Sequence, residues 1–181
     1  RHGMELEADR LRVELEIENV GSRAAPVGFG FHPYILRRLT IRDDDVILVV
    51  PAELVYPAER CLPTGPAVPV SGPTDLRWLR SLGFPNLDHC FTGFREREIR
   101  IIYRGSRTEV RFSFDEIFGH AVVYAPNSSE GLPVPFVAVE PVSCANDGFN
   151  LHAQGHDGTG ARVLIPGGRL LGRWEISMGD I

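Results

Sequence analysis

Lysine is absent from the 181-residue chain, and all 19 of its basic residues are arginine. A chain without lysine cannot form a Schiff base with a substrate or with pyridoxal phosphate. It also cannot supply the lysine of a phosphate-binding Walker loop. Several large classes of enzyme are therefore excluded.

Cysteine is scarce, and the three cysteines, Cys61, Cys90 and Cys144, are widely spaced. No Cys-x-x-Cys pair and no cluster of cysteine and histidine has the spacing of zinc ligands. A cupin metal site would need His-x-His where GFGFHPY has a single histidine. The simplest interpretation is buried free thiols in a reducing compartment, so we expect a cytoplasmic protein without a metal site.

Long apolar runs and clusters of positive charge are missing as well. No apolar run approaches the roughly 20 residues of a membrane-spanning helix. The formal net charge is −5 at pH 7, and this acidic balance argues against binding to nucleic acid or to anionic membranes. The length suits one domain, residues 1–181.

Strand patterns dominate what is present. Three segments alternate apolar and polar side chains, which predicts antiparallel strands with one solvated face. In these segments we expect Glu109 to face solvent and Met178 to face the core. The three segments are residues 11–20, 108–118 and 173–178, and shorter apolar runs predict more buried strands at 46–51, 99–103, 120–126, 135–141 and 161–166.

Helix is expected in one place. Residues 75–83, DLRWLRSLG, suggest a helical turn or two with Asp75 as the N-cap. Residues 51–75 are rich in proline and glycine and predict a long ordered loop. The chain as a whole predicts an all-β fold, an antiparallel β-sandwich.

The stretch GFGFHPYIL, residues 28–36, contains the first candidate for chemistry. On a strand, Gly28, Gly30 and His32 share one face, so we interpret the glycines as room for a ligand beside the histidine. Pro33 removes the next hydrogen-bond donor and predicts that the strand ends with His32 displayed. The alternative is a strand-end histidine whose nitrogens are satisfied by the backbone.

A second ionisable residue stands in a similar position. In PFVAVEP, Phe136 and Glu140 share a face, and Pro141 is expected to end the strand after the carboxylate. Partial burial raises the pKa of such a carboxyl toward neutral pH, so Glu140 and His32 are candidates for an acid–base pair. The alternative is a glutamate whose salt bridge serves only the structure.

The other ionisable residues carry weaker signals. Asp88, in NLDHCFTG, would by itself be a turn or capping residue. His89 follows it and, on a strand, faces the opposite side, and we interpret His120 as structural. The chain has no Gly-x-Ser-x-Gly elbow of a hydrolase.

Four segments, each weak alone, together resemble the aldose 1-epimerase (galactose mutarotase) family. They occur in the family's order over nearly the whole chain, as GFGFHPYI, TDLRWLRSLGFPNLDHCFTG, FVAVEPVSCANDGFN and VLIPGGRLLGRWEISM. The resemblance implies a galactose mutarotase-like supersandwich with a sugar bound in a cleft across one sheet. It also implies an isomerase that needs no cofactor and whose partner is a small-molecule sugar.

The same resemblance implies roles for five residues. Glu140 matches the general base that takes the proton from the anomeric hydroxyl, and His32 matches the general acid that protonates the ring oxygen. Asp88 matches a carboxylate that binds sugar hydroxyls, and Gly30 and Tyr34 are expected to contact the sugar. We expect the side-chain ends of His32 and Glu140 to lie roughly 5–8 Å apart across the cleft.

The chain departs from the family pattern in two ways. It matches only the C-terminal two thirds or so of the domain, so we expect a part of a longer protein that lacks the early strands, with their sugar-binding arginine and histidine. We then expect residues 11–20 to form an open edge that permits self-association. Gly168 stands where the family usually has glutamate, which we interpret as a surface change.

Other functions stay open at this point. A hexose-phosphate 1-epimerase would need arginines that converge on the phosphate. A non-catalytic carbohydrate-binding module could keep the same fold and cleft. A β-sandwich that serves only protein contacts is the third possibility.

Overall fold

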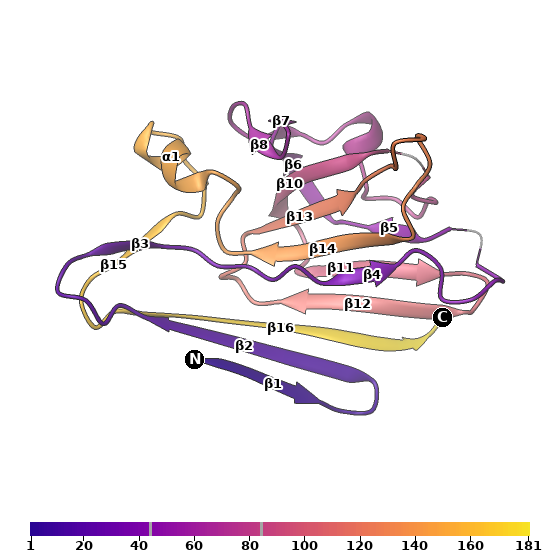
Figure 1. The fold of residues 1–181 in the computed structure, drawn as a ribbon, viewed down its shortest axis with the longest axis horizontal. Coiled ribbons are helices and arrows are strands. Elements are labelled where there is room, and N and C mark those ends of the chain that lie inside the picture. Colours follow the sequence, from indigo (N-terminus) through magenta and orange to yellow (C-terminus); the bar gives the residue numbers. More distant parts are fainter. Residues whose placement is uncertain (44, 84) are drawn as a thin grey trace.

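The computed structural model describes residues 1–43, 45–83 and 85–181, and two six-stranded antiparallel sheets dominate this part of the chain (Figure 1). The first sheet has the order β1 (His2–Leu6), β2 (Arg10–Glu18), β16 (Arg169–Asp180), β12 (Thr108–Phe114), β11 (Glu98–Tyr103), β5 (Ile47–Val49). The second has the order β4 (Tyr34–Leu36), β14 (Phe136–Val142), β13 (His120–Ala125), β10 (Leu87–Phe94), β6 (Ala52–Val55), β9 (Val68–Pro69). The all-β antiparallel sandwich predicted from the sequence is confirmed.

Smaller elements complete the fold. Two short ribbons pair β15 (Arg162–Leu164) with β3 (Ala25–Val27) and β7 (Ala58–Glu59) with β8 (Leu62–Pro63). One α-helix, α1 (Gly148–Ala153), and one 3-10 turn, η1 (Gly72–Thr74), lie within the described residues. No helix in this part of the chain has the length and hydropathy needed to cross a bilayer.

The hydrophobic core lies between the two sheets. Every second side chain of the strands points into it. Phe112 of β12 is fully buried and stacks on Trp174 of β16, with ring centroids 5.9 Å apart. From the second sheet, Phe91, Val123 and Val139 are also almost completely buried in the same cluster. Because successive side chains of a strand point to opposite faces, each strand that fills this core also presents a second face outward.

The alternation rule is wrong for Glu109, which was expected to face solvent. Its side chain is only 4% exposed, and its carboxylate lies between two arginines of the first sheet. Arg100 donates to Oε1 at 2.6 Å and Arg111 donates to Oε2 at 2.7 Å. Burial by itself raises the pKa of Glu109, but these hydrogen bonds outweigh burial and hold the pKa below its usual value. The outer face is therefore not uniformly solvated.

Two apolar side chains that were expected to be buried are exposed. Met178, near the end of β16, is 52% exposed, and Val163 of β15 is 61% exposed. β15 pairs only with β3, in a ribbon at one end of the molecule (Figure 1). An apolar residue is buried only where a second layer covers it, and no strand pattern shows where that layer stops.

The predicted helix at 75–83 is wrong. The structure has only the 3-10 turn η1 just before it, and Asp75 binds the guanidinium of Arg77 with two hydrogen bonds of 2.8 Å instead of capping a helix. The predicted loop at 51–75 also holds the short strands β6 to β9. The sequence did not indicate α1, whose Leu151 is buried.

The open edge of the first sheet is β1, which corrects the assignment of residues 11–20 to that position. β2 pairs with β16 on one side and with β1 on the other. Met4 lies opposite the buried Val13 but is 67% exposed, and Leu6 is 79% exposed. Figure 1 shows β1 at the outer margin of the molecule. The edge therefore combines unpaired backbone groups with exposed apolar side chains.

We expect a polypeptide of residues 1–181 to self-associate through β1, because such an edge can pair with a second edge strand. Size-exclusion chromatography over a concentration series should show an apparent mass that rises with concentration. Met4→Lys should weaken the association severalfold, since a charged side chain opposes edge pairing. Leu132→Lys, at another exposed position, is the matched control, and an elution volume independent of concentration would contradict the prediction.

Candidate active site

His32 lies on an irregular segment that follows the edge of the second sheet. Gly30 forms an isolated bridge with Val142, and the Phe31 N–H donates to the Pro141 carbonyl at 3.1 Å. After Pro33 the chain continues as β4, which pairs with the first half of β14. The expectation that a strand ends at His32 is therefore wrong, because Pro33 interrupts the ladder without turning the chain away from β14.

The glycines beside His32 do not leave room for a sugar ring. A Cβ on Gly30 would lie 2.4 Å from Cγ1 of Val142, and one on Gly28 would lie 3.0 Å from Cβ of Cys144. The space is filled by side chains that follow Glu140 on the same stretch of chain. Gly30 is required because the segment passes so close to β14. Its contact with the sugar stays a prediction.

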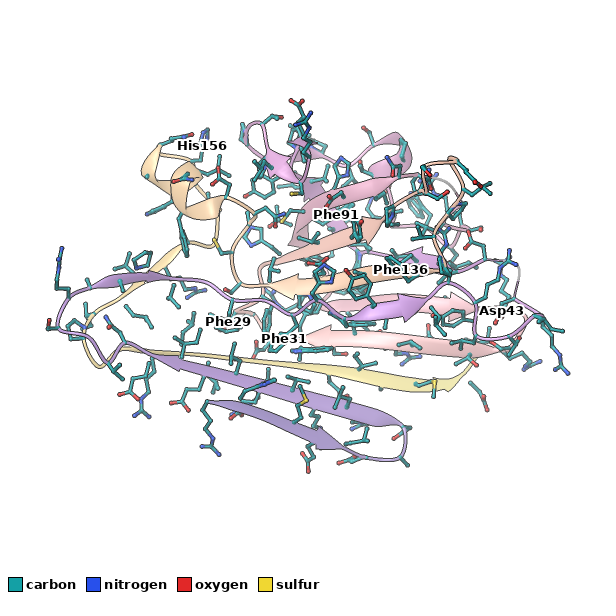
Figure 2. The ribbon with its side chains drawn as sticks, viewed as in Figure 1. Phe29, Phe31, Asp43, Phe91, Phe136 and His156 are labelled. Atoms are coloured by element: carbon teal, nitrogen blue, oxygen red, sulfur yellow. The ribbon has the colours of Figure 1, made fainter. Side chains whose placement is uncertain are left out.

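Alternate residues of the same segment anchor it in the core. Phe31 packs against Trp174 with ring centroids 5.2 Å apart, and Phe29 makes an edge-to-face contact with Phe118 at 5.6 Å. Figure 2 shows both phenylalanines between this segment and β16. The intervening residues, Gly30 and His32, are therefore directed to the outer face of the second sheet.

Glu140 lies on β14 at a point where the strand continues. β14 runs through Pro141 to Val142, so the proline does not end it as predicted. The Glu140 side chain is 12% exposed, and its Oε1 lies 3.0 Å from Nε2 of His32. This direct contact is closer than the separation expected from the sequence. A proton held between these two atoms can pass in either direction.

Asp88 shares the outer face with this pair. The sheet register aligns Asp88 of β10 with Tyr124 of β13, then with Ala138 of β14 and Tyr34 of β4. Glu140 lies two residues along from Ala138, so both carboxylates project from one face. They are close enough for the charge of Asp88 to act on Glu140.

Burial and like charge set the protonation of this face. Burial, followed by the negative charge of Asp88, raises the pKa of Glu140 to about 7. Burial also raises the pKa of Asp88, against the opposing effect of His89 and His32. A carboxyl whose pKa lies near neutral can accept and return a proton at working pH.

Aromatic rings surround the imidazole of His32. Tyr34 stacks on it with centroids 4.6 Å apart, and Tyr124 approaches it edge-on at 6.4 Å. Phe136 contacts Tyr34 edge-to-face at 5.0 Å. Sequence reasoning identified Tyr34 but not Tyr124. The signal that it missed is an aromatic with a polar tip in the otherwise apolar run HAVVYA, in register with Asp88.

The other histidines lie apart from this pair. His89 follows Asp88 on β10 and so points to the opposite face, and burial lowers its pKa. His120 is 3% exposed, its Nε2 is 3.0 Å from the Gly158 carbonyl, and burial lowers its pKa. Cys61, Cys90 and Cys144 are free thiols. Within the described residues, no group of three or more His, Cys, Asp or Glu side chains could hold a metal ion.

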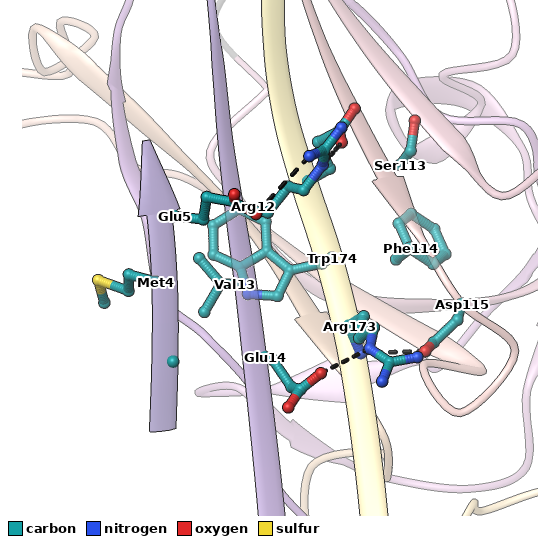
Figure 3. Close-up of a pocket in the computed structure, with 12 residues that line it drawn as sticks. Met4, Glu5, Arg12, Val13, Glu14, Ser113, Phe114, Asp115, Arg173 and Trp174 are labelled. Carbon is teal, nitrogen blue, oxygen red and sulfur yellow. Dashed lines mark hydrogen bonds and ion pairs between the residues drawn. The ribbon is translucent and has the colours of Figure 1, made fainter. Parts of the chain in front are cut away.

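Two cavities lie elsewhere and do not contain His32 or Glu140. The first cavity, of about 750 Å³, lies on the first sheet. The ion pairs Arg12–Glu175 and Glu14–Arg173 form part of its wall (Figure 3). Its lining carries four carboxylates and two arginines, and neither His32 nor Glu140 lines it. A smaller one of about 340 Å³ lies between Gly28, Val142 and α1, beside the pair but not around it. The candidate site is therefore the open outer face of the second sheet.

The protein is thus an antiparallel β-sandwich with His32 and Glu140 in contact on one outer face, near the carboxylate of Asp88. The family model described as aldose 1-epimerase matches residues 1–176. The chain belongs to the aldose 1-epimerase family.

Individual relatives agree with this assignment. The uncharacterized protein YihR of Escherichia coli strain K12 is 31% identical over 144 residues, which cover 77% of this chain and 44% of YihR. A galactose mutarotase-like protein from Clostridium acetobutylicum shares the fold at a TM-score of 0.81 with 14% identity, over 99% of this chain and 55% of that one. The Slr1438 protein of Synechocystis sp. PCC 6803 gives 0.74 with 20% identity, over 99% and 54%. The chain thus spans about half the length of these relatives.

The contact between Gly30 and Val142 predicts the effect of a single methyl group. Gly30→Ala should lower the free energy of unfolding by about 1–3 kcal/mol, because the new Cβ must displace the segment that carries His32. Urea denaturation measures this loss. Gly65→Ala is the matched control, since nothing lies within 4 Å of a Cβ at that position. Equal stability of the two variants would show that the segment does not need this close approach.

Proposed function

We propose that this chain carries the acid–base site of an aldose 1-epimerase, which interconverts the α and β anomers of a hexose by opening and reclosing the ring. The observation that carries the proposal is the 3.0 Å contact between Nε2 of His32 and Oε1 of Glu140. The acid and the base then lie on one outer face, beside a second carboxylate, Asp88. Family membership supports this choice of reaction.

The reaction can be followed proton by proton. Ionised Glu140 takes the proton of the anomeric hydroxyl while protonated His32 gives a proton to the ring oxygen, and the C1–O5 bond breaks to leave the open-chain aldehyde. Rotation about C1–C2 turns the other side of the carbonyl toward the C5 hydroxyl. Reclosure returns a proton from the C5 hydroxyl to His32 and one from Glu140 to the new anomeric hydroxyl. Each such transfer typically contributes about 10²–10⁴-fold.

This sequence of steps regenerates both residues and consumes nothing else. The sugar meets the pair in its ion-paired form, with His32 charged and Glu140 ionised. Nε2 of His32 and Oε1 of Glu140 are in contact in the structure. In the complex, the ring oxygen of the sugar replaces Oε1 as the partner of His32, and the anomeric hydroxyl replaces Nε2 as the partner of Glu140. Asp88, on the same face, accepts hydrogen bonds from sugar hydroxyls in this proposal.

Charge favours an unphosphorylated sugar over a hexose phosphate. On β4, β14, β13 and β10 the side chains of the outer face include two carboxylates and no arginine. A phosphoryl group is usually held by converging arginines and is repelled by carboxylates. A neutral aldohexose meets no such penalty on this face.

A non-catalytic sugar-binding module is the second candidate, and the protonation of Glu140 argues against it. Binding alone needs only a hydrogen-bond acceptor, such as a carboxylate oxygen of Asp88. A buried carboxyl with a pKa of about 7 in contact with a histidine suits proton transfer better than binding. We therefore favour catalysis.

Removal of the base should abolish the reaction but leave the shape of the site. Glu140→Gln should reduce the rate of anomer exchange by at least about 10²-fold, because the amide cannot accept the proton, while sugar binding persists. Polarimetry on freshly dissolved α-glucose and α-galactose follows the reaction, and calorimetry follows binding. Glu130→Gln, in an exposed turn, is the matched control. An unchanged rate in Glu140→Gln would show that Glu140 is structural.

The pH dependence follows from the raised pKa of Glu140. On the acidic limb of the profile, exchange should increase as pH rises through about 7, since only ionised Glu140 accepts the hydroxyl proton. Loss of the proton that His32 donates sets the alkaline limb. Asp88→Asn should move this rise to lower pH, because it removes the negative charge that helps to raise the pKa of Glu140. Rates measured from pH 5 to 9, across roughly two units on either side, test both statements. A rise that keeps its position in Asp88→Asn would contradict the coupling.

A further inference from the structure

The imidazole of His32 is held in an unusual way for a residue that transfers protons. Its side chain is 48% exposed, and its Nε2 faces Glu140. A catalytic histidine is usually oriented by a hydrogen bond from its other ring nitrogen to a carboxylate or a carbonyl. The described residues show no such bond for Nδ1 of His32, so its orientation depends on other contacts.

Those contacts come from one aromatic ring above all. Tyr34 stacks on the imidazole with centroids 4.6 Å apart and planes inclined by 30°. Phe136 braces Tyr34 from the side, at 5.0 Å and 85°. Both Tyr34 and Phe136 lie on strands that pair in register, so the bracing contact is built into the sheet.

We propose that Tyr34 is a positioning residue, whose ring holds the imidazole of His32 in line with Glu140. The inference deepens the proposed function and rests on it. It replaces the direct contact between Tyr34 and the sugar that was expected from the sequence. Tyr34 acts through His32 and not on the substrate.

The physical basis is the attraction between two stacked aromatic rings. Offset-stacked rings attract each other at centroid separations of about 4.5–7 Å. The imidazole lies within that range of Tyr34, so the stack favours one orientation of the imidazole. The same stack limits rotation of a half-exposed side chain, and a misplacement of about 1 Å can cost about 10²-fold in rate.

The test compares three variants. Tyr34→Leu, which removes the ring, should lower kcat about tenfold with KM changed by less than about twofold. Tyr34→Phe keeps the ring and should restore most of kcat. Leu36→Ala, two residues along the same strand and 57% exposed, is the control for a truncation at this edge.

A second measurement reads the contact without any turnover. In NMR spectra, the ring protons of His32 should be shifted upfield by the tyrosine ring in the wild type, and equally in Tyr34→Phe and Leu36→Ala. In Tyr34→Leu they should move to unstacked positions. Folded spectra of all variants exclude loss of structure as the cause.

Three results would overturn the inference. A rise in KM at unchanged kcat in Tyr34→Leu would place the ring on the sugar. An equal loss in Tyr34→Phe would assign the role to the hydroxyl, and unmoved His32 resonances in Tyr34→Leu would show that the stack does not exist. If the wild type shows no anomer exchange, the proposed function fails, and the resonances then decide by themselves whether Tyr34 orients His32.

Discussion

Residues 28–33 pass in close contact with β14, and this contact brings His32 and Glu140 of the candidate site together. Gly30 lies so close to Val142 that a methyl group has no space, and backbone hydrogen bonds to Pro141 and Ser143 hold the segment there. His32 is thereby carried to Glu140, which belongs to the strand that the segment follows. This backbone geometry accounts for the 3.0 Å distance between Nε2 of His32 and Oε1 of Glu140.

The sandwich core makes that geometry rigid. Phe29 and Phe31 alternate with Gly30 and His32, and they are packed against Phe118 and Trp174 between the sheets. A shift of His32 away from Glu140 would have to pull these rings out of a close-packed interior. The same period of two therefore anchors the segment on one face and directs His32 to the other.

Burial and charge also act on the ionisable groups of this face. Glu140 is mostly buried, and both this burial and the nearby charge of Asp88 favour its protonated form. Tyr34 stacks on the face of the His32 imidazole. The solved structures of relatives are less than 25% identical to this chain, so they support the fold alone.

The sequence by itself determined the all-β class, because the period of two that marks a strand is set by residues next to one another. It also placed Glu140 on a strand, although that strand continues past Pro141. The alternation could not show that Glu109 is buried, since its partners include Arg100 on a neighbouring strand. Nor could it show that β1 covers the edge of β2.

Only the tertiary structure decided how the site is assembled. The glycines beside His32 were interpreted as room for a ligand, but the pairing with β14 shows that Val142 occupies the space beside Gly30. The distance from His32 to Glu140 and the rings of Tyr124 and Phe136 likewise follow from strand order and register. These depend on contacts between segments far apart in the chain, whereas the alternation of side chains depends only on the pleat of each strand.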